Sequence, residues 1–295
     1  MNKKFLCKIT LIIFSVVIFF SAKVSAEGIW RLDGTLESSL PRNFRAIEDL
    51  RISGSGQPTA SSLLKLKEYL AEKMTANSKI YIVDLREESH GFANGFPVSY
   101  YENKNLANFF KRRDEIETVE VEQLTDMLDR KIKFVPLGNE DKKLFKPLNV
   151  KVKNVETERQ KVSELEMEYV RFSTTDMYFP TPEVVDEFIL FVANLNENDW
   201  VHFHCQAGHG RTSTFMIMYD ILKHPEKSLW NVASEQELIG GSDVVNLKED
   251  KGDHNYYIEA HNLRANNLIK FFYYVRGVQN EEIGLQWSEY LKLNK

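Results

Sequence analysis

Cysteine is scarce in this chain, and so are the two residues that mark flexible linkers. Cys7 and Cys205 are the only cysteines among 295 residues, which excludes a framework of several disulfides. Glycine and proline occur only 14 and 8 times. Neither an internal repeat nor a low-complexity tract is found. These absences favour a compact α/β chain without long linkers.

Long apolar runs are also missing, apart from one near the start. Three lysines within the first eight residues precede Ile9–Phe20, a largely apolar run of 12 residues, and Val24–Ala26 offers small residues for cleavage. This pattern predicts a secretory signal peptide over residues 1–26. The run is short for a membrane span, and Lys23 follows it closely. We therefore expect export, to a periplasm or outside the cell, with no stable membrane anchor after cleavage.

Removal of this segment changes two properties of the chain. Cys205 becomes the sole thiol, so the mature protein has no internal disulfide. Four lysines and no acid are lost, so 38 − 4 = 34 basic residues face 43 acidic ones, for a net charge of −9. A chain this acidic repels polyanions at long range, which argues against a nucleic acid partner. An anionic substrate must then be held by a local basic patch.

The most informative motif surrounds the remaining cysteine. Residues 205–211 form a Cys-x5-Arg loop, placed between an apolar strand that ends at His204 and a helix over 212–223. Glycines inside the loop allow successive N–H groups to curl around an anion at the positive end of a helix. Arg211 offers a planar fork that matches two phosphate oxygens, and the same donors stabilise a thiolate nucleophile at Cys205. The loop predicts phosphate contacts from Gln206, Ala207, Gly208, His209 and Gly210.

A thiolate attack on a phosphomonoester also needs a proton for the leaving oxygen. Asp176 is the best candidate for this acid, since it lies between a strand and a helix that begins at Thr181-Pro182, 205 − 176 = 29 residues before the nucleophile. Taken alone, Asp176 would be a turn or capping residue. Thr212 follows the arginine and is a candidate to hydrogen-bond the sulfur. Neither this chemistry nor the pattern calls for a metal or another cofactor.

The periodicity of the chain predicts strands that alternate with helices, and hence a central, mostly parallel sheet flanked by helices. Strands are expected at 80–85, 132–137, 150–155, 167–172 and 200–204. Helices are expected at 63–74, 106–110, 119–128, from Pro182, and at 212–223, 228–238, 256–276 and 287–291. The strand-rich stretch within 95–172 is a candidate inserted β-rich subdomain.

Several segments together resemble the bacterial protein tyrosine phosphatase-like phytases, a family within the Cys-x5-Arg phosphatase superfamily. The resemblance rests on Asp84–Phe92, Asn105–Asn108, Thr175-Asp176, His202–Cys205 and Gln236–Gly241, and it extends from about residue 41 to the end. It implies a tyrosine-phosphatase-like core with a small partial β-barrel, spanning residues 27–295. It also implies Cys205 as nucleophile, Arg211 as phosphate binder and Asp176 as general acid, with inositol polyphosphates as substrates.

The expected substrate contacts outside the loop depart from this family. Arg45, Lys142, Lys143 and Tyr257 resemble retained contacts. Four positions lack the basic residue expected by comparison with the family: Met177, Thr181, Asp253 and Ala260. A thinner basic ring favours less phosphorylated inositols or another phosphomonoester.

Three other functions are compatible with parts of the pattern. The first keeps the chemistry and changes the substrate to a phosphopeptide, as in a secreted tyrosine or dual-specificity phosphatase. The second is an inactive module that binds a phosphorylated ligand, which would need neither Cys205 nor Asp176. The third, sulfur transfer or arsenate reduction, fits poorly because such reductases usually need further cysteines.

Overall fold

The computed structural model describes residues 28–294, except for residues 76, 250, 251, 253 and 254. The expected signal peptide over residues 1–26 and the departure at Asp253 therefore lie outside the described residues. Among the helices that are described, none is both long and apolar enough to cross a bilayer.

A five-stranded sheet forms the centre of the molecule, in the order β10-β4-β11-β3-β2. Four of its strands run parallel, and only the edge strand β2 is antiparallel to its neighbour. In the middle of the sheet, Phe203 lies opposite both Gly54 and Val83. The mostly parallel sheet expected from the sequence is confirmed. Its strands are β2 (Arg45–Ile47), β3 (Ile52–Ser55), β4 (Ile80–Arg86), β10 (Glu168–Thr174) and β11 (Trp200–His204).

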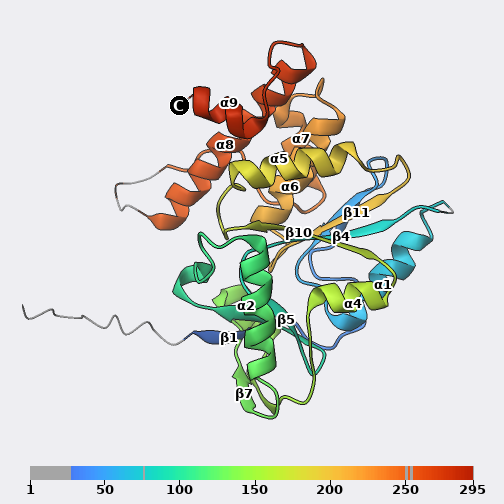
Figure 1. Ribbon diagram of the computed structural model, residues 1–295, viewed down its shortest axis with the longest axis vertical. Coiled ribbons are helices and arrows are strands. Elements are labelled where there is room, and N and C mark those ends of the chain that lie inside the picture. The colour runs from blue at the N-terminus through green and yellow to red at the C-terminus, as the bar shows by residue number, and fades with distance from the viewer. Residues whose placement is uncertain (1–27, 76, 250–251, 253–254, 295) are drawn as a thin grey trace, which may run out of the picture.

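Helices cover both faces of this sheet, as Figure 1 shows. Alternate residues of β4 explain why: Ile82 packs with α1 in one apolar cluster, whereas Val83 packs with α5 and α6 in the other. On the first side lie α1 (Ala60–Ala71) and α4 (Glu158–Glu164). On the second lie α5 (Pro182–Ala193), α6 (Gly210–Lys223), α7 (Leu229–Leu238), α8 (Tyr256–Gln279) and α9 (Trp287–Leu293).

A smaller β-rich region packs beside the main sheet around its own apolar cluster, which includes Leu32, Val98 and Phe134. Its antiparallel sheet has the order β1-β6-β5-β9, and a separate hairpin pairs β7 with β8. Two of these strands, β1 and β5, come from outside residues 95–172, and the inserted subdomain stays a prediction. The elements are β1 (Ile29–Leu32), β5 (His90–Ala93), β6 (Phe96–Tyr101), α2 (Arg113–Asp126), β7 (Lys131–Phe134), α3 (Gly138–Leu144), β8 (Leu148–Lys151) and β9 (Val155–Glu156).

Two stretches differ from the sequence-based expectation. The helix predicted at 106–110 is absent; instead a short 3-10 turn, η1 (Asn103–Asn105), is followed by turns. Phe110, inside the predicted range, has φ +70°, which no α-helix accommodates. The strand-rich stretch over 132–172 is interrupted by α3 and α4, and a capping box between Thr157 and Gln160 starts the second of these helices.

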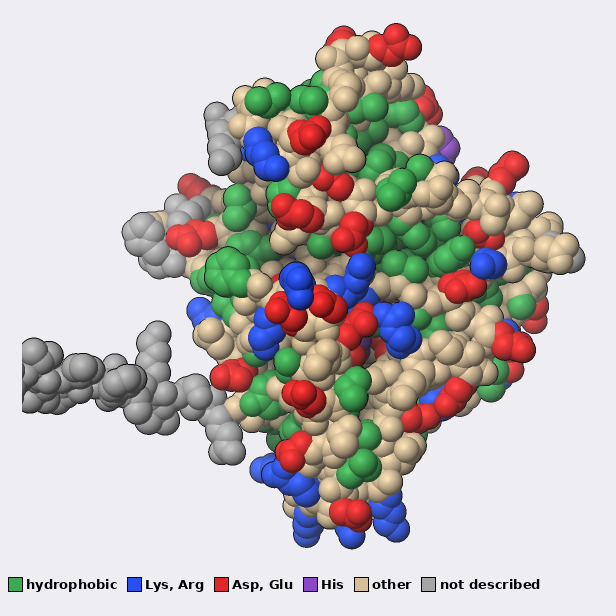
Figure 2. All heavy atoms as spheres, in the orientation of Figure 1, with side chains coloured by type: hydrophobic (Ala, Val, Ile, Leu, Met, Phe, Trp, Pro, Cys, Tyr) green, Lys and Arg blue, Asp and Glu red, His purple; other side chains and the backbone are tan. Residues whose placement is uncertain are grey.

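Charges of both signs are spread over the visible face (Figure 2), and basic side chains gather at the end where β7 lies. Exposed Lys131 and Lys133 on β7 and Lys151 on β8 contribute to this end of the molecule. Although the chain has a net negative charge, its visible surface therefore carries charges of both signs, with a local excess of basic groups on the β7–β8 hairpin.

Candidate active site

The Cys-x5-Arg loop connects the end of β11 to the start of α6, so the positive end of that helix faces the loop. Gly208 has φ +79°, and a Cβ there would lie 2.4 Å from the backbone nitrogen of Gly56. Only glycine fits this conformation and this close approach without movement of the backbone. The loop therefore owes its shape to Gly208 packed against the end of β3.

The thiol of Cys205 lies at the base of this loop and is nearly buried, with 4% of the residue exposed. Thr212 donates a hydrogen bond of 3.2 Å from Oγ1 to Sγ of Cys205. The structure thus brings Thr212 and Cys205 together, as expected from the sequence.

Arg211 is held by a carboxylate that the sequence analysis did not single out. Its Nη1 lies 2.7 Å from Glu88 Oε2 and its Nη2 2.9 Å from Oε1, a bidentate pair between buried side chains. Burial alone would lower the pKa of Arg211, but Glu88 and Asp176 hold it well above its usual value. Burial alone would likewise raise the pKa of Glu88, but Arg211 and Arg86 hold it well below. The guanidinium is therefore charged, and its orientation is fixed.

Asp176 follows β10 and lies beside the guanidinium of Arg211. Its Oδ1 lies 3.3 Å from Arg211 Nη2 and accepts from the backbone N–H of Met177 at 3.1 Å, while Asn105 Nδ2 donates to its Oδ2 at 3.0 Å. The side chain keeps 35% of its surface exposed. The carboxylate is thus oriented by the protein and still accessible to a leaving group.

The remaining loop residues are tied to the surrounding chain. Gln206 donates from Nε2 to Asp141 Oδ2 at 2.9 Å, so its side chain turns away from the loop toward α3. The carbonyl of Ala207 accepts from Asn43 Nδ2 at 2.7 Å. His209 remains 41% exposed and lies 3.6 Å from a carboxylate oxygen of Glu140. Their backbone, rather than their side chains, is what the loop presents to an anion.

Arg45, which the sequence predicts as a substrate contact, lies against the phosphate loop. It is 4% exposed and lies behind the loop, where Nη1 donates to the carbonyl of Gly208 at 2.8 Å and Nη2 to Ser213 Oγ at 3.1 Å. Burial lowers its pKa to about 10, against the opposing effect of Cys205. Arg45 therefore braces the loop, because both ends of its guanidinium are engaged with the protein.

The other expected contacts lie on neighbouring helices. Lys142 and Lys143 are exposed on α3, and neither forms an ion pair with any residue that the structure describes. Tyr257 on α8 is 55% exposed, and its ring centroid lies 5.4 Å from that of Tyr256. Ala260 is buried on the same helix. None of these contacts with substrate is tested by the geometry, and they stay predictions.

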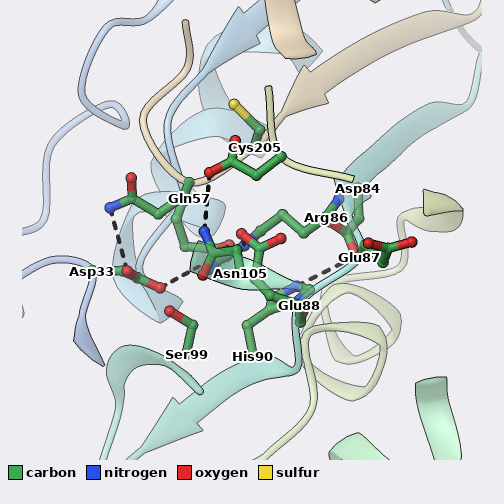
Figure 3. A network of polar contacts seen from close by, with 12 residues as sticks. Asp33, Gln57, Asp84, Arg86, Glu87, Glu88, His90, Ser99, Asn105 and Cys205 are labelled. Carbon is green, nitrogen blue, oxygen red and sulfur yellow. Dashed lines mark hydrogen bonds and ion pairs between the residues drawn. The ribbon is translucent and has the colours of Figure 1, made fainter. Parts of the chain in front are cut away.

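A buried network of charged residues supports the loop from below, as Figure 3 shows for Arg86, Glu88 and His90 beneath Cys205. Arg86 forms ion pairs with Asp33 and with Glu88, each at 2.9 Å. It therefore links the residue that follows β1 to Glu88, the carboxylate that holds Arg211. Removal of one member from such a buried network leaves an uncompensated charge, which costs about 3–5 kcal/mol. The network thus stabilises the orientation of Glu88.

One part of this network has the composition of a metal site. Ligand atoms of Asp84, His90 and Glu158 lie within 4.8 Å of one another, and all three residues are buried. His90 Nε2, however, already lies 3.1 Å from Glu158 and 3.3 Å from Asp84. Although burial opposes it, Asp84 and Glu120 raise the pKa of His90 to about 10. With the imidazole protonated, the cluster is an internal ion-pair group of one cation among carboxylates.

Residues 83–223 match the family model of the protein tyrosine phosphatase-like phytases, described as inositol hexakisphosphate. The sequence is 31% identical over 193 residues to effector protein hopD2 of Pseudomonas syringae pv. tomato, across 63% of this chain and 40% of that protein.

Solved structures extend the likeness to nearly the whole fold. The tandemly repeated protein tyrosine phosphatase-like phytase of Mitsuokella multacida matches with a TM-score of 0.82 and 31% identity, over 90% of this chain and 49% of that one. A second Mitsuokella structure with the same values is a myo-inositol phosphatase in complex with myo-inositol-(1,3,4,5)-tetrakisphosphate. A phytase of this type from Bdellovibrio bacteriovorus matches with a TM-score of 0.75 and 29% identity, over 91% of this chain and 96% of that one. The chain thus spans less than half the length of hopD2 and about half that of the Mitsuokella proteins.

Proposed function

We propose that the chain, which is similar to the protein tyrosine phosphatase-like phytases over residues 83–223 and in its fold, is a phosphoric monoester hydrolase of that family that acts on inositol phosphates. The observation that carries the proposal is the meeting of three groups in one place. Cys205 lies at the base of an anion-binding loop, Arg211 closes that loop, and Asp176 lies 3.3 Å from the guanidinium. A nucleophile, a phosphate binder and an acid are the parts that phosphomonoester cleavage requires.

In the first step, the thiolate of Cys205 attacks phosphorus and a P–S bond forms as the P–O ester bond breaks. Asp176, in its protonated form, donates its proton to the leaving oxygen, which departs as the alcohol. The loop amides and Arg211 stabilise the charge on the three equatorial oxygens. Most of the rate enhancement comes from this positioning and electrostatic stabilisation.

In the second step, the phosphocysteine is hydrolysed. Asp176, now a carboxylate, takes a proton from water as that water attacks phosphorus, and the P–S bond breaks. Inorganic phosphate and the thiolate of Cys205 are released. Thr212 stabilises the departing sulfur through the hydrogen bond that it already makes at 3.2 Å.

The proposed substrate class follows from the family and from charge. A related Mitsuokella enzyme is known in complex with an inositol tetrakisphosphate. In this chain Arg45 is engaged behind the loop, and Ala260 is buried where the family comparison suggests a basic residue. A mature net charge of 34 − 43 = −9 also disfavours the most anionic substrates. We therefore expect partly phosphorylated inositols to be hydrolysed faster than the hexakisphosphate.

Mutation of the two reacting residues tests the proposed chemistry. We expect Cys205→Ser to lower kcat by a factor on the order of 10⁴ or more, and Asp176→Asn by about 10²–10⁴-fold. Release of phosphate from an aryl phosphate in the presence of a chelator, before and after thiol alkylation, is the measurement. Activity of Cys205→Ser near that of the wild type would overturn the mechanism and leave only a phosphate-binding role.

A second experiment tests the substrate class. The kcat/KM values for inositol hexakisphosphate, inositol tetrakisphosphate and a phosphotyrosyl peptide are compared at two ionic strengths. The proposal expects the tetrakisphosphate to be the best substrate and the salt dependence to be shallow. A phosphotyrosyl peptide that is hydrolysed faster than either inositol would show the chain to be a protein phosphatase instead.

Export is part of the proposal and rests on the sequence of residues 1–26 alone. The lysines, the apolar run and the small residues at Val24–Ala26 have the pattern of a signal peptide. Expression of the full chain in a bacterial host, followed by N-terminal sequencing of the protein outside the cytoplasm, tests it. An uncleaved chain retained in the cytoplasm would contradict it.

A further inference from the structure

Arg264, on α8, lies against the first residue of α6. The residue is only 3% exposed, although it carries a charge. A Cβ built on Gly210 would lie 2.4 Å from Nη1 of Arg264 but 3.8 Å from Nη2. The guanidinium therefore occupies the space that a side chain at position 210 would fill, and Nη1 is the atom directed at the loop.

Among the residues that the structure describes, a hydrogen-bond partner is found at only one end of this guanidinium. Nη2 lies 3.1 Å from Nδ1 of His261, whose Nε2 lies 2.8 Å from the carbonyl of Asn246. A carbonyl only accepts, so Nε2 carries the ring proton and Nδ1 accepts from Arg264. His261 is therefore neutral, and burial lowers its pKa accordingly. Within the described residues, Nε and Nη1 of Arg264 have no acceptor at all.

The contrast with the neighbouring arginine is informative. Arg211 is equally buried, but its charge is matched by the bidentate contact with Glu88. No carboxylate lies within ion-pair distance of Arg264 among the residues described. Burial lowers the pKa of Arg264, and Asp176 and Cys205 offset only part of that effect. A buried cation with free donors is unfavourable in the empty protein, and an anion at this place would relieve it.

The place in question is the positive end of α6. Gly210 is its first residue, and the N–H groups of a first helical turn have no partner within the helix. Arg211 and Glu88 together are formally neutral. The positive charge of Arg211 is therefore already balanced before a phosphoryl dianion enters the loop. We propose that Arg264 is a second phosphate-binding guanidinium, whose free Nη1 donates to an oxygen of the phosphoryl group held at the start of α6. The inference rests on the proposed function, since it concerns the same loop.

Binding of inorganic phosphate tests this without turnover. Affinity is measured by calorimetry in the Cys205→Ser background, with Arg264→Met and Arg264→Lys compared. Methionine keeps the apolar stem and removes the donors, so we expect roughly 10- to 100-fold weaker binding, the effect of one charged hydrogen bond. Lysine restores the charge, and we expect it to recover most of the affinity. Arg276→Gln, exposed on the same helix, is the matched control and leaves the affinity unchanged.

Two further readouts separate this role from others. Without phosphate, Arg264→Met is expected to melt at the same or a higher temperature than the parent, because an unmatched buried charge is removed. In an active background, kcat/KM is expected to fall by the same factor for an aryl phosphate and for inositol tetrakisphosphate, since both place one phosphoryl group in the loop.

Three results would overturn the inference. Unchanged phosphate affinity in Arg264→Met would exclude the contact. A loss confined to the tetrakisphosphate would assign Arg264 to a neighbouring phosphate instead. A lower melting temperature, with affinity that lysine does not recover, would make Arg264 a structural brace. The phosphate-affinity and melting results do not depend on turnover by Cys205, so failure of the proposed chemistry would be recognised separately, as activity retained in Cys205→Ser.

Discussion

Asn105 donates a hydrogen bond of 3.0 Å from Nδ2 to Oδ2 of Asp176, across 71 residues of sequence. Asn105 ends a turn in which three successive residues have positive φ, of 46°, 59° and 66°. Asparagine tolerates this region, whereas Lys104 is strained there. The bond leaves Oδ1 of Asp176 beside Arg211 at 3.3 Å. The turn thus stores local strain in order to orient the carboxylate of the proposed acid.

We expect Asn105→Ala to lower kcat about 10-fold with little change in KM, because Asp176 loses its orientation while the phosphate loop is untouched. The measurement compares two aryl phosphates, one with a good and one with a poor leaving group. A good leaving group needs little protonation, so its hydrolysis should be less affected. An equal loss for both substrates would contradict a role for Asn105 through the acid.

Glu88 is expected to stabilise both the fold and the orientation of Arg211. Glu88→Gln breaks a buried ion pair and should reduce the free energy of unfolding by about 3–5 kcal/mol. Because the pKa of Glu88 is held well below its usual value, its contribution is present above about pH 4.5 and is lost as the pH falls. Denaturant unfolding at pH 7 and at pH 4 measures this, and the difference between variant and wild type should shrink at the lower pH.

The control for Glu88 is another buried carboxylate that does not touch Arg211. Glu120 pairs with Arg171 at 2.9 Å. Glu120→Gln should destabilise the protein similarly and leave kcat nearly unchanged. Glu88→Gln should in addition lower kcat at least about 10-fold, because the guanidinium of Arg211 would lose its orientation toward phosphate. Equal kcat values in the two variants would show that Glu88 acts only on stability.

We expect that no other residue can replace Gly208, because its φ is positive and because a side chain there would collide with neighbouring backbone atoms. A Cβ there would lie 2.4 Å from Gly56 N and 2.5 Å from Ser55 C, both backbone atoms that cannot turn aside. Gly138 has nearly the same φ, +80°, with nothing within 4 Å. Gly138→Ala should therefore cost about 1–2 kcal/mol of stability and keep activity. Gly208→Ala should reduce the stability further and abolish the binding of inorganic phosphate, which calorimetry measures. Retained binding would show that the loop does not depend on glycine at this position.

The sequence predicted the parts of the site that are contiguous in the chain. The Cys205 loop, Thr212 and the flanking strand and helix follow from spacing and local chemistry. Asp176 was found because one acid was needed near a nucleophile. Glu88 and Asn105 were missed, because their roles depend on partners 123 and 71 residues away. Both residues lie in segments that resemble the family, Asp84–Phe92 and Asn105–Asn108, and that was the one available signal.

One error in the prediction has a physical cause. The helix expected at 106–110 gave way to turns, and Phe110, at the end of that stretch, has φ +70°, which an α-helix does not accommodate. Arg45 stays a predicted substrate contact, and the structure adds that its guanidinium donates to the carbonyl of Gly208 and to Ser213 Oγ. Because 163 residues separate Arg45 from Gly208, this contact depends on the packing of the fold.

Thr212 is expected to act mainly on the second chemical step. Thr212→Val removes the hydroxyl that donates to Sγ of Cys205, so the thiolate becomes a poorer leaving group and the phosphocysteine should accumulate. Rapid-quench kinetics with an aryl phosphate should show a larger burst and a steady state slowed about 10-fold, as expected for loss of one hydrogen bond to a charged group. Thr214→Val is the control, because Thr214 bonds the carbonyl of Gly210 rather than the sulfur. A steady-state rate that falls without any change in burst amplitude would place Thr212 in the first step instead.

The stability of the protein should depend on pH through His90. Among carboxylates of Asp84, Glu120 and Glu158, and despite its burial, His90 has a pKa raised to about 10, against 6.5 for the ordinary group. A raised pKa means that the folded state binds the proton more tightly, so the stabilisation is complete below about pH 6.5 and is lost as the pH rises through about 10. His90→Gln should therefore lower the melting temperature by several degrees at pH 6, where ~1 kcal/mol corresponds to about 2–4 °C in a chain of this size. The difference from wild type should diminish steadily toward pH 10. A constant difference between pH 6 and pH 10 would show that His90 stabilises the cluster by packing and hydrogen bonding alone, without its charge.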